Sequence, residues 1–247
     1  MKNLIIFFFS IICILSCSNT GENYYATAER QILDSTQIVT TSNTGYIAEL
    51  TELQRCDILV RPNHNWCAGT TPVEGGTGFG HCVLVIEGAT AQCTDSLLSK
   101  AVIFESHSRD VPEPYQLRKI KALVNNIDKK YSNSSFSSIH KGYRYRLRME
   151  LTEGQKDSII AFVKNQDNDV SSWRASKAFN NYDTDTSNFE QYDKHYWYCS
   201  LLVWQAFYNV LGVDIDANKN FAVYPNDIIN SPYFNDDGRM KQKRVRF

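Results

Sequence analysis

A cysteine begins an apolar segment near the end of the chain, in the stretch YWYCSLLVWQAFYNVLG (196–212). Apolar residues and one alanine follow Cys199 at the spacing of one helix face: Leu202, Val203, Ala206, Phe207 and Val210. The backbone N–H groups and the dipole at a helix N-terminus lower the pKa of a thiol there. The spacing therefore predicts a helix beginning at Cys199, with this thiol as a candidate nucleophile. The alternative is an inert core residue, because free cysteine is among the most buried residue types.

A cysteine nucleophile needs a base within hydrogen-bond reach, and the chain offers five histidines. His81 stands where a glycine-rich loop enters an apolar run, in GFGHCVLVI (78–86). The glycines leave its ring accessible and the strand fixes its backbone, so His81 is the candidate base; a structural histidine is the alternative. His64 is a weaker candidate for substrate contact. His195 is disfavoured as the base because it lies only four residues before Cys199, and His107 and His140 have no special context.

The base in turn needs a third group that orients its ring. Glu87 lies on the same predicted strand as His81, six positions further along, and six strand residues span about 20 Å, so Glu87 cannot reach the His81 ring. Glu105 lies near the end of the next predicted strand, VIFES (102–106), and can approach His81 from the side. The sequence therefore favours Glu105 as the orienting residue, with an exposed glutamate at a strand end as the alternative.

The N-terminal residues are typical of an export signal. MKNLIIFFFSIICILSC (1–17) has one lysine, then an apolar run too short for a spanning helix, and ends with a small residue directly before Cys17. This pattern resembles a bacterial lipoprotein signal, in which cleavage leaves Cys17 as the lipid-bearing N-terminus. We expect a signal peptide at 1–16, a lipid-anchored tether at 17–45 and one domain at 46–247. A plain secretory signal and an uncleaved anchor are the alternatives.

The remaining cysteines are odd in number, since Cys13 leaves with the signal and Cys17 carries lipid. Five are left: Cys56, Cys67, Cys82, Cys93 and Cys199. An odd number in an exported protein leaves at least one unpaired thiol, with two disulfides optional among the others. No pair of cysteines or histidines has metal-ligand spacing, so no metal is expected. The formal net charge of −1 and the lack of a basic block argue against a nucleic-acid partner.

The element order predicts an α+β fold in which an antiparallel sheet packs against helices. Residues 61–80 are rich in Gly, Pro, Asn and Thr and read as a long loop, and 167–195 as a second loop. Strands are expected at 56–60, 81–88, 100–108 and 142–151, with a strand-like run at 220–230 and an end strand in the basic tail 238–247. Helices are expected at 46–55, 151–166 and from 199 on, with a turn and short helix at 89–98 and partial helix at 115–130.

The segment GYRYRLRMEL (142–151) alternates aromatic or apolar residues with arginines. This predicts a half-buried strand whose outer face carries Arg144, Arg146 and Arg148. The arginines are expected on a solvated face, and an anionic-ligand patch or membrane-facing surface is the alternative.

Several ordered segments carry a resemblance to a known family. The segments are CDILVRP (56–62), GFGHCVLVIEG (78–88), VIFES (102–106), HYWYCSLLVWQAF (195–207) and VYPNDI (223–228). Together, over about residues 46–235, the chain resembles the circularly permuted papain-like amidases of the NlpC superfamily, of the YaeF/YiiX type. In unpermuted members the cysteine helix precedes the histidine strand, whereas here it follows. An active site depends on geometry and not on chain order, so a permuted chain can build the same site.

The resemblance implies roles for individual residues. Cys199 would be the nucleophile at a helix N-terminus, His81 the general base and acid, and Glu105 the residue that orients His81. Tyr198 is a candidate for contact with the oxyanion, and the weaker candidates for lining the site are Asp57, His64 and Trp66. The sequence departs from the family where Cys56 replaces a frequent Gly and where Ser200-Leu201 replaces Ser-Glu. These departures leave the substrate open.

The expected function is that of a membrane-anchored cysteine hydrolase in a bacterial cell envelope, without a cofactor. Its substrate would be an amide in a cell-wall peptide or a lipid acyl group. A non-catalytic lipoprotein of the same fold that binds peptide or lipid is the first alternative. An accessory protein of a surface assembly is the second.

Overall fold

The computed structural model describes residues 49–62, 79–107, 111, 115–124, 136, 144–166, 170–171, 177, 196–217, 222–234 and 243–247. The predicted signal peptide (1–16), the whole predicted tether (17–45) with Cys17, and the first residues of the predicted domain (46–48) lie outside these residues. The loop that carries His64, Trp66 and Cys67 also lies outside them. Among the helices in the described ranges, none has both the length and the apolar character needed to cross a membrane.

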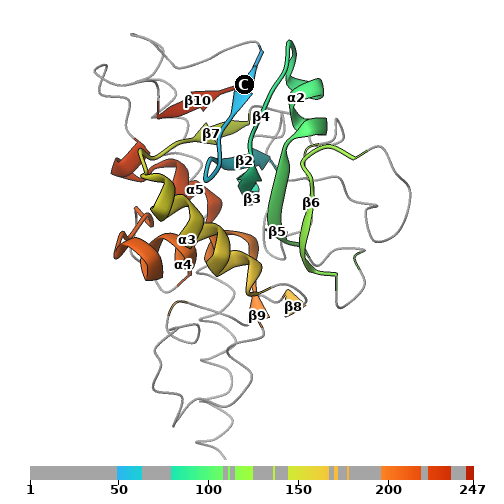
Figure 1. The fold of residues 1–247 in the computed structure, drawn as a ribbon. Helices are drawn as coiled ribbons and strands as arrows, with labels where there is room; N and C mark the ends of the chain where they lie inside the picture. The colour runs from blue at the N-terminus through green and yellow to red at the C-terminus, as the bar shows by residue number, and fades with distance from the viewer. Residues whose placement is uncertain are drawn as a thin grey trace, which may run out of the picture.

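A six-stranded antiparallel sheet forms the centre of the described structure (Figure 1). Its strand order is β10-β7-β2-β3-β5-β6. The two middle strands have continuous apolar runs, as expected for strands covered on both faces. In chain order the strands are β2 (Ile58–Pro62), β3 (Phe79–Glu87), β5 (Val102–Ser106), β6 (Leu117–Lys121), β7 (Tyr145–Leu147) and β10 (Arg244–Arg246).

Helices cover both faces of this sheet. On one face lie α3 (Glu153–Lys164), α4 (Cys199–Leu211) and α5 (Pro225–Ile229), and α2 (Thr94–Lys100) lies on the other (Figure 1). A 3₁₀ turn, Pro232–Phe234, follows α5. Two small ladders complete the fold: β1 (Glu52–Leu53) with β4 (Ala89–Thr90), and β8 (Val170–Ser171) with β9 (Tyr196–Trp197). The predicted α+β fold, with an antiparallel sheet packed against helices, is confirmed.

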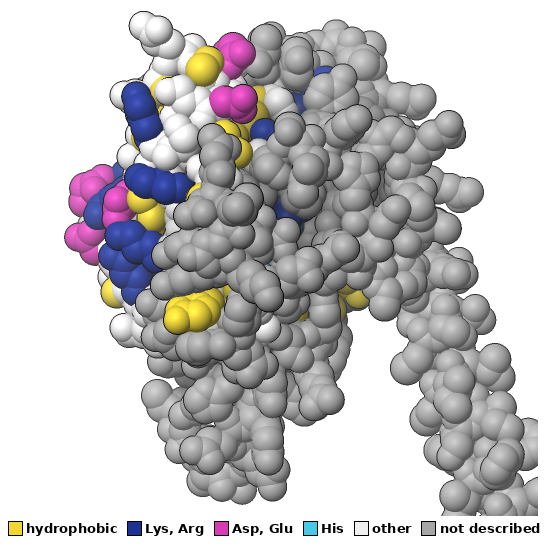
Figure 2. All heavy atoms as spheres, turned by 90° about the vertical axis from the view of Figure 1, so that its right-hand side faces the viewer, with side chains coloured by type: hydrophobic (Ala, Val, Ile, Leu, Met, Phe, Trp, Pro, Cys, Tyr) yellow, Lys and Arg dark blue, Asp and Glu magenta, His cyan; other side chains and the backbone are white. Residues whose placement is uncertain are grey.

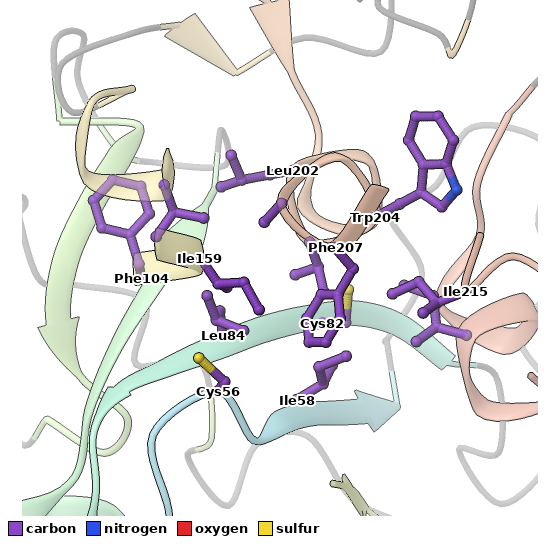
Figure 3. Packing of buried hydrophobic residues seen from close by; sticks show 14 of the residues in the cluster. Cys56, Ile58, Cys82, Leu84, Phe104, Ile159, Leu202, Trp204, Phe207 and Ile215 are labelled. Carbon is purple, nitrogen blue, oxygen red and sulfur yellow. The ribbon is translucent and has the colours of Figure 1, made fainter. Parts of the chain in front are cut away.

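The side chains of β3 divide between two hydrophobic cores, because alternate residues of a strand point to opposite faces. Cys82, Leu84 and Ile86 belong to the core beneath α3 and α4. Figure 3 shows Cys82 and Leu84 on β3 facing α4, and Phe207 extending from the helix toward the strand. The alternate residues belong to the second core, against α2: Val83, Val85, Leu97 and Leu98. By the same alternation, His81 begins on the face opposite α4.

The helices begin and end where local signals place them. Thr152 caps α3 in a capping box, in which its hydroxyl accepts a hydrogen bond from the Gln155 N–H (3.3 Å) and the Gln155 side chain accepts one from the Thr152 N–H (2.9 Å). The helix α4 ends at Gly212, whose φ of 66° is the left-handed conformation that glycine adopts without strain. The predicted helices over these residues are confirmed.

Three predicted elements are wrong over the described residues. The helix predicted at 46–55 is instead extended over 49–54, because β1 finds backbone partners in β4 and Leu50 and Leu53 are buried in the second core. The partial helix at 115–130 contains the strand β6, which pairs along the edge of β5. The strand-like run at 220–230 contains the helix α5, which has Pro225 at its first turn and an Asp227 carboxylate accepting from the Tyr224 N–H (2.9 Å).

The arginines of 142–151 do not form a solvated strand face. The strand β7 lies between β2 and β10, so Arg146 is 7% exposed. Arg148 donates to both carboxylate oxygens of Asp57, at 2.7 and 2.8 Å. On the molecular face shown in Figure 2, described Lys and Arg side chains lie next to Asp and Glu side chains, so charges of both signs are mixed there.

Candidate active site

Cys199 is the first residue of α4, and neighbouring hydrogen bonds fix its position. Tyr198 precedes the helix in an extended conformation (φ −122°, ψ 163°), and its carbonyl accepts from the Leu202 N–H (3.1 Å). The Tyr198 hydroxyl accepts from the Val223 N–H (2.9 Å), and the Ser200 hydroxyl donates to the Val223 carbonyl (2.8 Å). These two bonds tie the start of α4 to the segment before α5. Cys199 itself is 5% exposed.

The sulfur of Cys199 lies beside the backbone of β3, 3.9 Å from the carbonyl oxygen of Gly80. In the described strands, β3 pairs with β5 only from Leu84 onward. Nearer the site, Ser106 of β5 donates its hydroxyl proton to the carbonyl of Trp197 (2.9 Å), two residues before Cys199. The start of α4 therefore meets the sheet where β3 and β5 are no longer paired. This arrangement lets Cys199, which comes from the helix side of the sheet, approach His81, whose side chain leaves β3 on the opposite face.

His81, Glu105 and Arg118 form a buried chain of polar contacts across β3, β5 and β6. The Nε2 atom of His81 lies 2.9 Å from Oε2 of Glu105. The other carboxylate oxygen accepts from Nε and from a terminal nitrogen of Arg118, at 3.0 and 2.8 Å. All three side chains are buried. The histidine therefore has one ring nitrogen fixed by a carboxylate that is itself held by a guanidinium.

The register of the sheet explains why these residues meet. Arg118 of β6 lies directly opposite Glu105 of β5. His81 of β3 lies opposite Arg61 of β2. Antiparallel pairing of neighbouring strands brings side chains of the same face close together. The polar residues thus gather at one end of the central strands, while apolar residues fill the rest of the same face.

The electrostatics of the His81–Glu105 pair favour the charged forms of both groups. Burial alone would raise the pKa of Glu105, but the charge of Arg118 and the hydrogen bond with His81 hold it well below its ordinary value. Burial alone would lower the pKa of His81. Hydrogen bonds with Cys199 and Glu105 outweigh that effect and the repulsion from Arg61, so the His81 pKa is raised.

The thiol of Cys199 is acidic, and its neighbours are the cause. The largest effect on the Cys199 pKa is a hydrogen bond from Cys82, which lowers it. Burial raises the Cys199 pKa, and the hydrogen bond with His81 lowers it further. The Cys199 pKa therefore lies well below the ordinary thiol value. Burial and the contact with Cys199 raise the pKa of Cys82. By contrast, burial raises the pKa of Cys56 to about 12. The two buried thiols are therefore shifted in opposite directions, with the Cys199 pKa lowered and the Cys82 pKa raised.

The cysteines in the described ranges carry free thiols. These are Cys56, Cys82, Cys93 and Cys199, of which Cys93 is exposed. Neither optional disulfide therefore forms among these four, and Cys67 lies outside the described residues. Within the same ranges, no group of three or more His, Cys, Asp and Glu side chains is arranged to hold a metal ion.

The other candidate residues do not join this cluster or are not described. Asp57 is 1% exposed and accepts hydrogen bonds from Arg148 and from the Gln54 N–H (2.8 Å). It lies four residues, or about 13 Å, before Arg61, the residue of β2 that pairs with His81, so it does not reach the cluster. It supports the turn before β2. The hydroxyl of Tyr198 accepts from Val223 as described above. His64, Trp66 and Cys17 lie outside the described residues.

Local sequence patterns do not identify three residues of the site. Arg118 lies in a segment that was expected to be partly helical, where Leu117 and Ile120 mimic helical spacing. Cys82 is adjacent to His81 in the chain. Because adjacent residues of a strand point to opposite faces, the sequence does not predict that both side chains contact the Cys199 sulfur. His107 follows Glu105 by two residues, and this i, i+2 spacing on a strand is a signal that could have identified it.

The comparisons with known proteins are sparse. No protein family model matches this sequence, and no curated protein matches it. A crystal structure of the metalloprotein YiiX from Escherichia coli O157:H7, DUF1105, is similar with a TM-score of 0.43 and 12% identity, over 78% of this chain and 96% of that chain.

Proposed function

We propose that the protein is a cysteine hydrolase in which Cys199, His81 and Glu105 act as nucleophile, base and orienting residue. The observation that carries the proposal is the buried 2.9 Å hydrogen bond between His81 and Glu105, beside a cysteine at a helix N-terminus. The lowered Cys199 pKa and the raised His81 pKa support a thiolate–imidazolium pair. The sequence resemblance to permuted papain-like amidases agrees with this arrangement, because the cysteine helix follows the histidine strand in the chain.

The mechanism follows from the two ring nitrogens of His81. Glu105 engages Nε2, which leaves Nδ1 for the proton of Cys199. The thiolate attacks a carbonyl carbon, and the new C–S bond creates an oxyanion that backbone N–H groups at the start of α4 can stabilise. His81 then gives its proton to the leaving amine or alcohol as the carbonyl bond to that group breaks. Water, deprotonated by His81, attacks the thioester and releases the acid and the free thiol.

Arg118 has a supporting role in this mechanism. Its two hydrogen bonds to one oxygen of Glu105 keep the carboxylate ionised although it is buried. An ionised Glu105 stabilises the imidazolium that forms when His81 accepts a proton. Removal of Arg118 would take away the positive charge that favours the ionised form of the buried Glu105 carboxylate. Glu105 would then stabilise the His81 imidazolium less, and His81 would be a weaker base.

The substrate class and the location of the protein come from the sequence. A lipoprotein-type N-terminus ending at Cys17 fits an enzyme held at a membrane of the bacterial cell envelope. A cell-wall peptide amide or a lipid acyl group is within reach there, and both present the carbonyl that a thiolate attacks.

A non-catalytic binding lipoprotein is the second candidate, and one observation favours it. Cys199 is only 5% exposed, so its side chain could serve the core and not a substrate. In that case the polar chain from His81 to Arg118 would be a buried structural network.

Alkylation of the folded protein with iodoacetamide across pH separates the two candidates. The hydrolase proposal predicts rapid modification of Cys199 below about pH 7, because the thiolate is the reactive form. The Cys199→Ala variant reports the background from other thiols, including the exposed Cys93. Modification of Cys199 only near the ordinary thiol pKa, or none at all, supports the binding protein.

A further inference from the structure

A second histidine, His107, packs against the proposed base. Its ring centroid lies 5.2 Å from that of His81, and the two planes meet at 71°, an edge-to-face arrangement. His107 follows β5 directly, and its backbone N–H donates to the Gln116 carbonyl (2.7 Å). Because it lies two residues after Glu105, it continues the same side of the strand. The chain therefore anchors a rigid ring beside His81 from the strand that also supplies Glu105.

A histidine at position 107 does not stabilise the core better than an apolar ring of similar shape would. His107 is 6% exposed, and its Nδ1 atom is buried without a hydrogen-bond partner among the described residues. A buried nitrogen without a partner lowers stability compared with an apolar ring of similar shape. Burial also lowers the pKa of His107 to about 3, so the ring is neutral at every pH at which Cys199 could act.

The charges around His81 come from every neighbouring element. Arg61 on β2 disfavours the imidazolium, whereas Glu105 on β5 and Cys199 on α4 favour it. Arg118 on β6 acts on Glu105. Cys82 lies on β3, the strand of His81, and acts on Cys199. A cationic side chain at position 107 would add repulsion to that of Arg61. A neutral ring adds contact without adding charge.

We propose that His107 is a positioning residue, whose ring contact fixes the plane of the His81 imidazole between Glu105 and Cys199. The hydrogen bond to Glu105 fixes one nitrogen of His81 but leaves the ring able to tilt about that point. The edge-to-face contact with His107 removes this freedom and directs the second nitrogen at the sulfur. The expected effect of His107 on the reactivity of Cys199 rests on the proposed hydrolase function. The placement of the His81 ring by His107 does not depend on that function.

Three substitutions separate ring contact from core filling. His107→Ala removes the ring, His107→Leu fills the space without a flat ring, and His107→Phe restores a flat ring without nitrogens. Val102→Ala is the matched control, because Val102 is buried on β5 within the other core and its truncation weakens packing on the same strand. Thermal unfolding of each variant measures the purely structural loss.

The first readout is the rate of Cys199 alkylation as a function of pH. We expect His107→Ala and His107→Leu to slow alkylation at about pH 6 by about tenfold or more, because a misplaced base loses its near-attack geometry. His107→Phe should retain most of the wild-type rate, and Val102→Ala should keep the wild-type pH profile. Wild-type profiles in the Ala and Leu variants would overturn the positioning role.

The second readout is nuclear magnetic resonance of the His81 ring, which needs no reactive thiol. We expect one sharp set of ring signals in the wild type and in His107→Phe, and shifted or broadened signals in His107→Leu. Unchanged His81 signals in His107→Leu would contradict the proposal. If Cys199 is unreactive in the wild type while the His81 signals respond to substitution at 107, the hydrolase proposal fails and the positioning role stands.

Discussion

The imidazole of His81 and the carboxylate of Glu105 are joined by a 2.9 Å hydrogen bond inside the sheet, although 24 positions separate them in the chain. Both side chains are almost fully buried, at 2% and 1% exposed. Burying a carboxylate is unfavourable unless it is paired, and Arg118 supplies the charge that pairs it. The stability of the protein should therefore depend on the ionisation of Glu105.

Substitution Glu105→Gln tests this dependence. We expect a loss of about 3–5 kcal/mol in the free energy of unfolding at pH 7, because the variant removes the carboxylate charge that pairs with the buried Arg118 guanidinium. The Glu105 pKa is lower in the folded chain than the ordinary 4.5, so its stabilising effect is present above that value and is lost as the pH falls through the folded pKa. Urea unfolding of wild type and variant at several pH values measures the difference.

The comparison has a clear contrary outcome. The gap in unfolding free energy between wild type and Glu105→Gln should shrink as the pH falls below 4.5. A gap that stays constant from neutral to acidic pH would show that the ionised carboxylate contributes nothing to stability. Glu87→Gln is the matched control, because Glu87 pairs with Lys119 at the exposed surface and such pairs contribute little.

Cys82 should tune the reactivity of Cys199. Its hydrogen bond is the largest cause of the lowered Cys199 pKa. We expect Cys82→Ala to slow alkylation of Cys199 at about pH 6 by about tenfold, because hydrogen bonds to charged groups contribute about 1.5–3 kcal/mol. Cys82→Ser keeps an O–H donor and should retain more of the rate. Equal rates in the two variants would mean that the Cys82 donor is unimportant.

Cys56 occupies a backbone conformation that few residues tolerate. Its φ of 67° lies in the left-handed region. Its side chain is 2% exposed and belongs to the core beneath α3 and α4. Glycine adopts this backbone region without the strain that a Cβ atom causes. We expect Cys56→Gly to change the free energy of unfolding by less than about 1 kcal/mol, because strain relief offsets the lost packing.

A β-branched residue at position 56 provides the contrast. Cys56→Val should destabilise the protein by about 2 kcal/mol or more, since it combines a strained backbone with a branched side chain. Thermal or urea unfolding of both variants checks this order. Greater stability of the valine variant than of the glycine variant would rule out backbone strain as the cause.

The sequence could predict those parts of the site that depend on local patterns. The helix at Cys199 follows from apolar spacing within one segment, and the strands of His81 and Glu105 follow from short runs of apolar residues. Their meeting was predictable because strands close in the chain tend to pair. Glu87 was excluded by distance along the strand, and the structure shows it paired with Lys119 instead.

The rest of the site depends on long-range geometry that no local pattern encodes. Arg118 reaches Glu105 only because β6 pairs with β5, and the sequence of β6 has too few apolar residues to indicate a strand. Cys82 and His81 both contact Cys199 because the sulfur lies beside the β3 backbone where pairing with β5 has ended. Arg148 was expected at a solvated face, and the structure places it against Asp57.

The most direct test of the central claim is detection of an acyl-enzyme. The folded protein is incubated with para-nitrophenyl acetate, and the site of acetylation is determined by peptide mass spectrometry, with Cys199→Ala and His81→Ala as variants. The account predicts acetylation of Cys199 in the wild type, none at position 199 in Cys199→Ala, and slow acetylation of Cys199 in His81→Ala. A Cys199 that stays unmodified in the wild type, or is acetylated equally fast without His81, would contradict it.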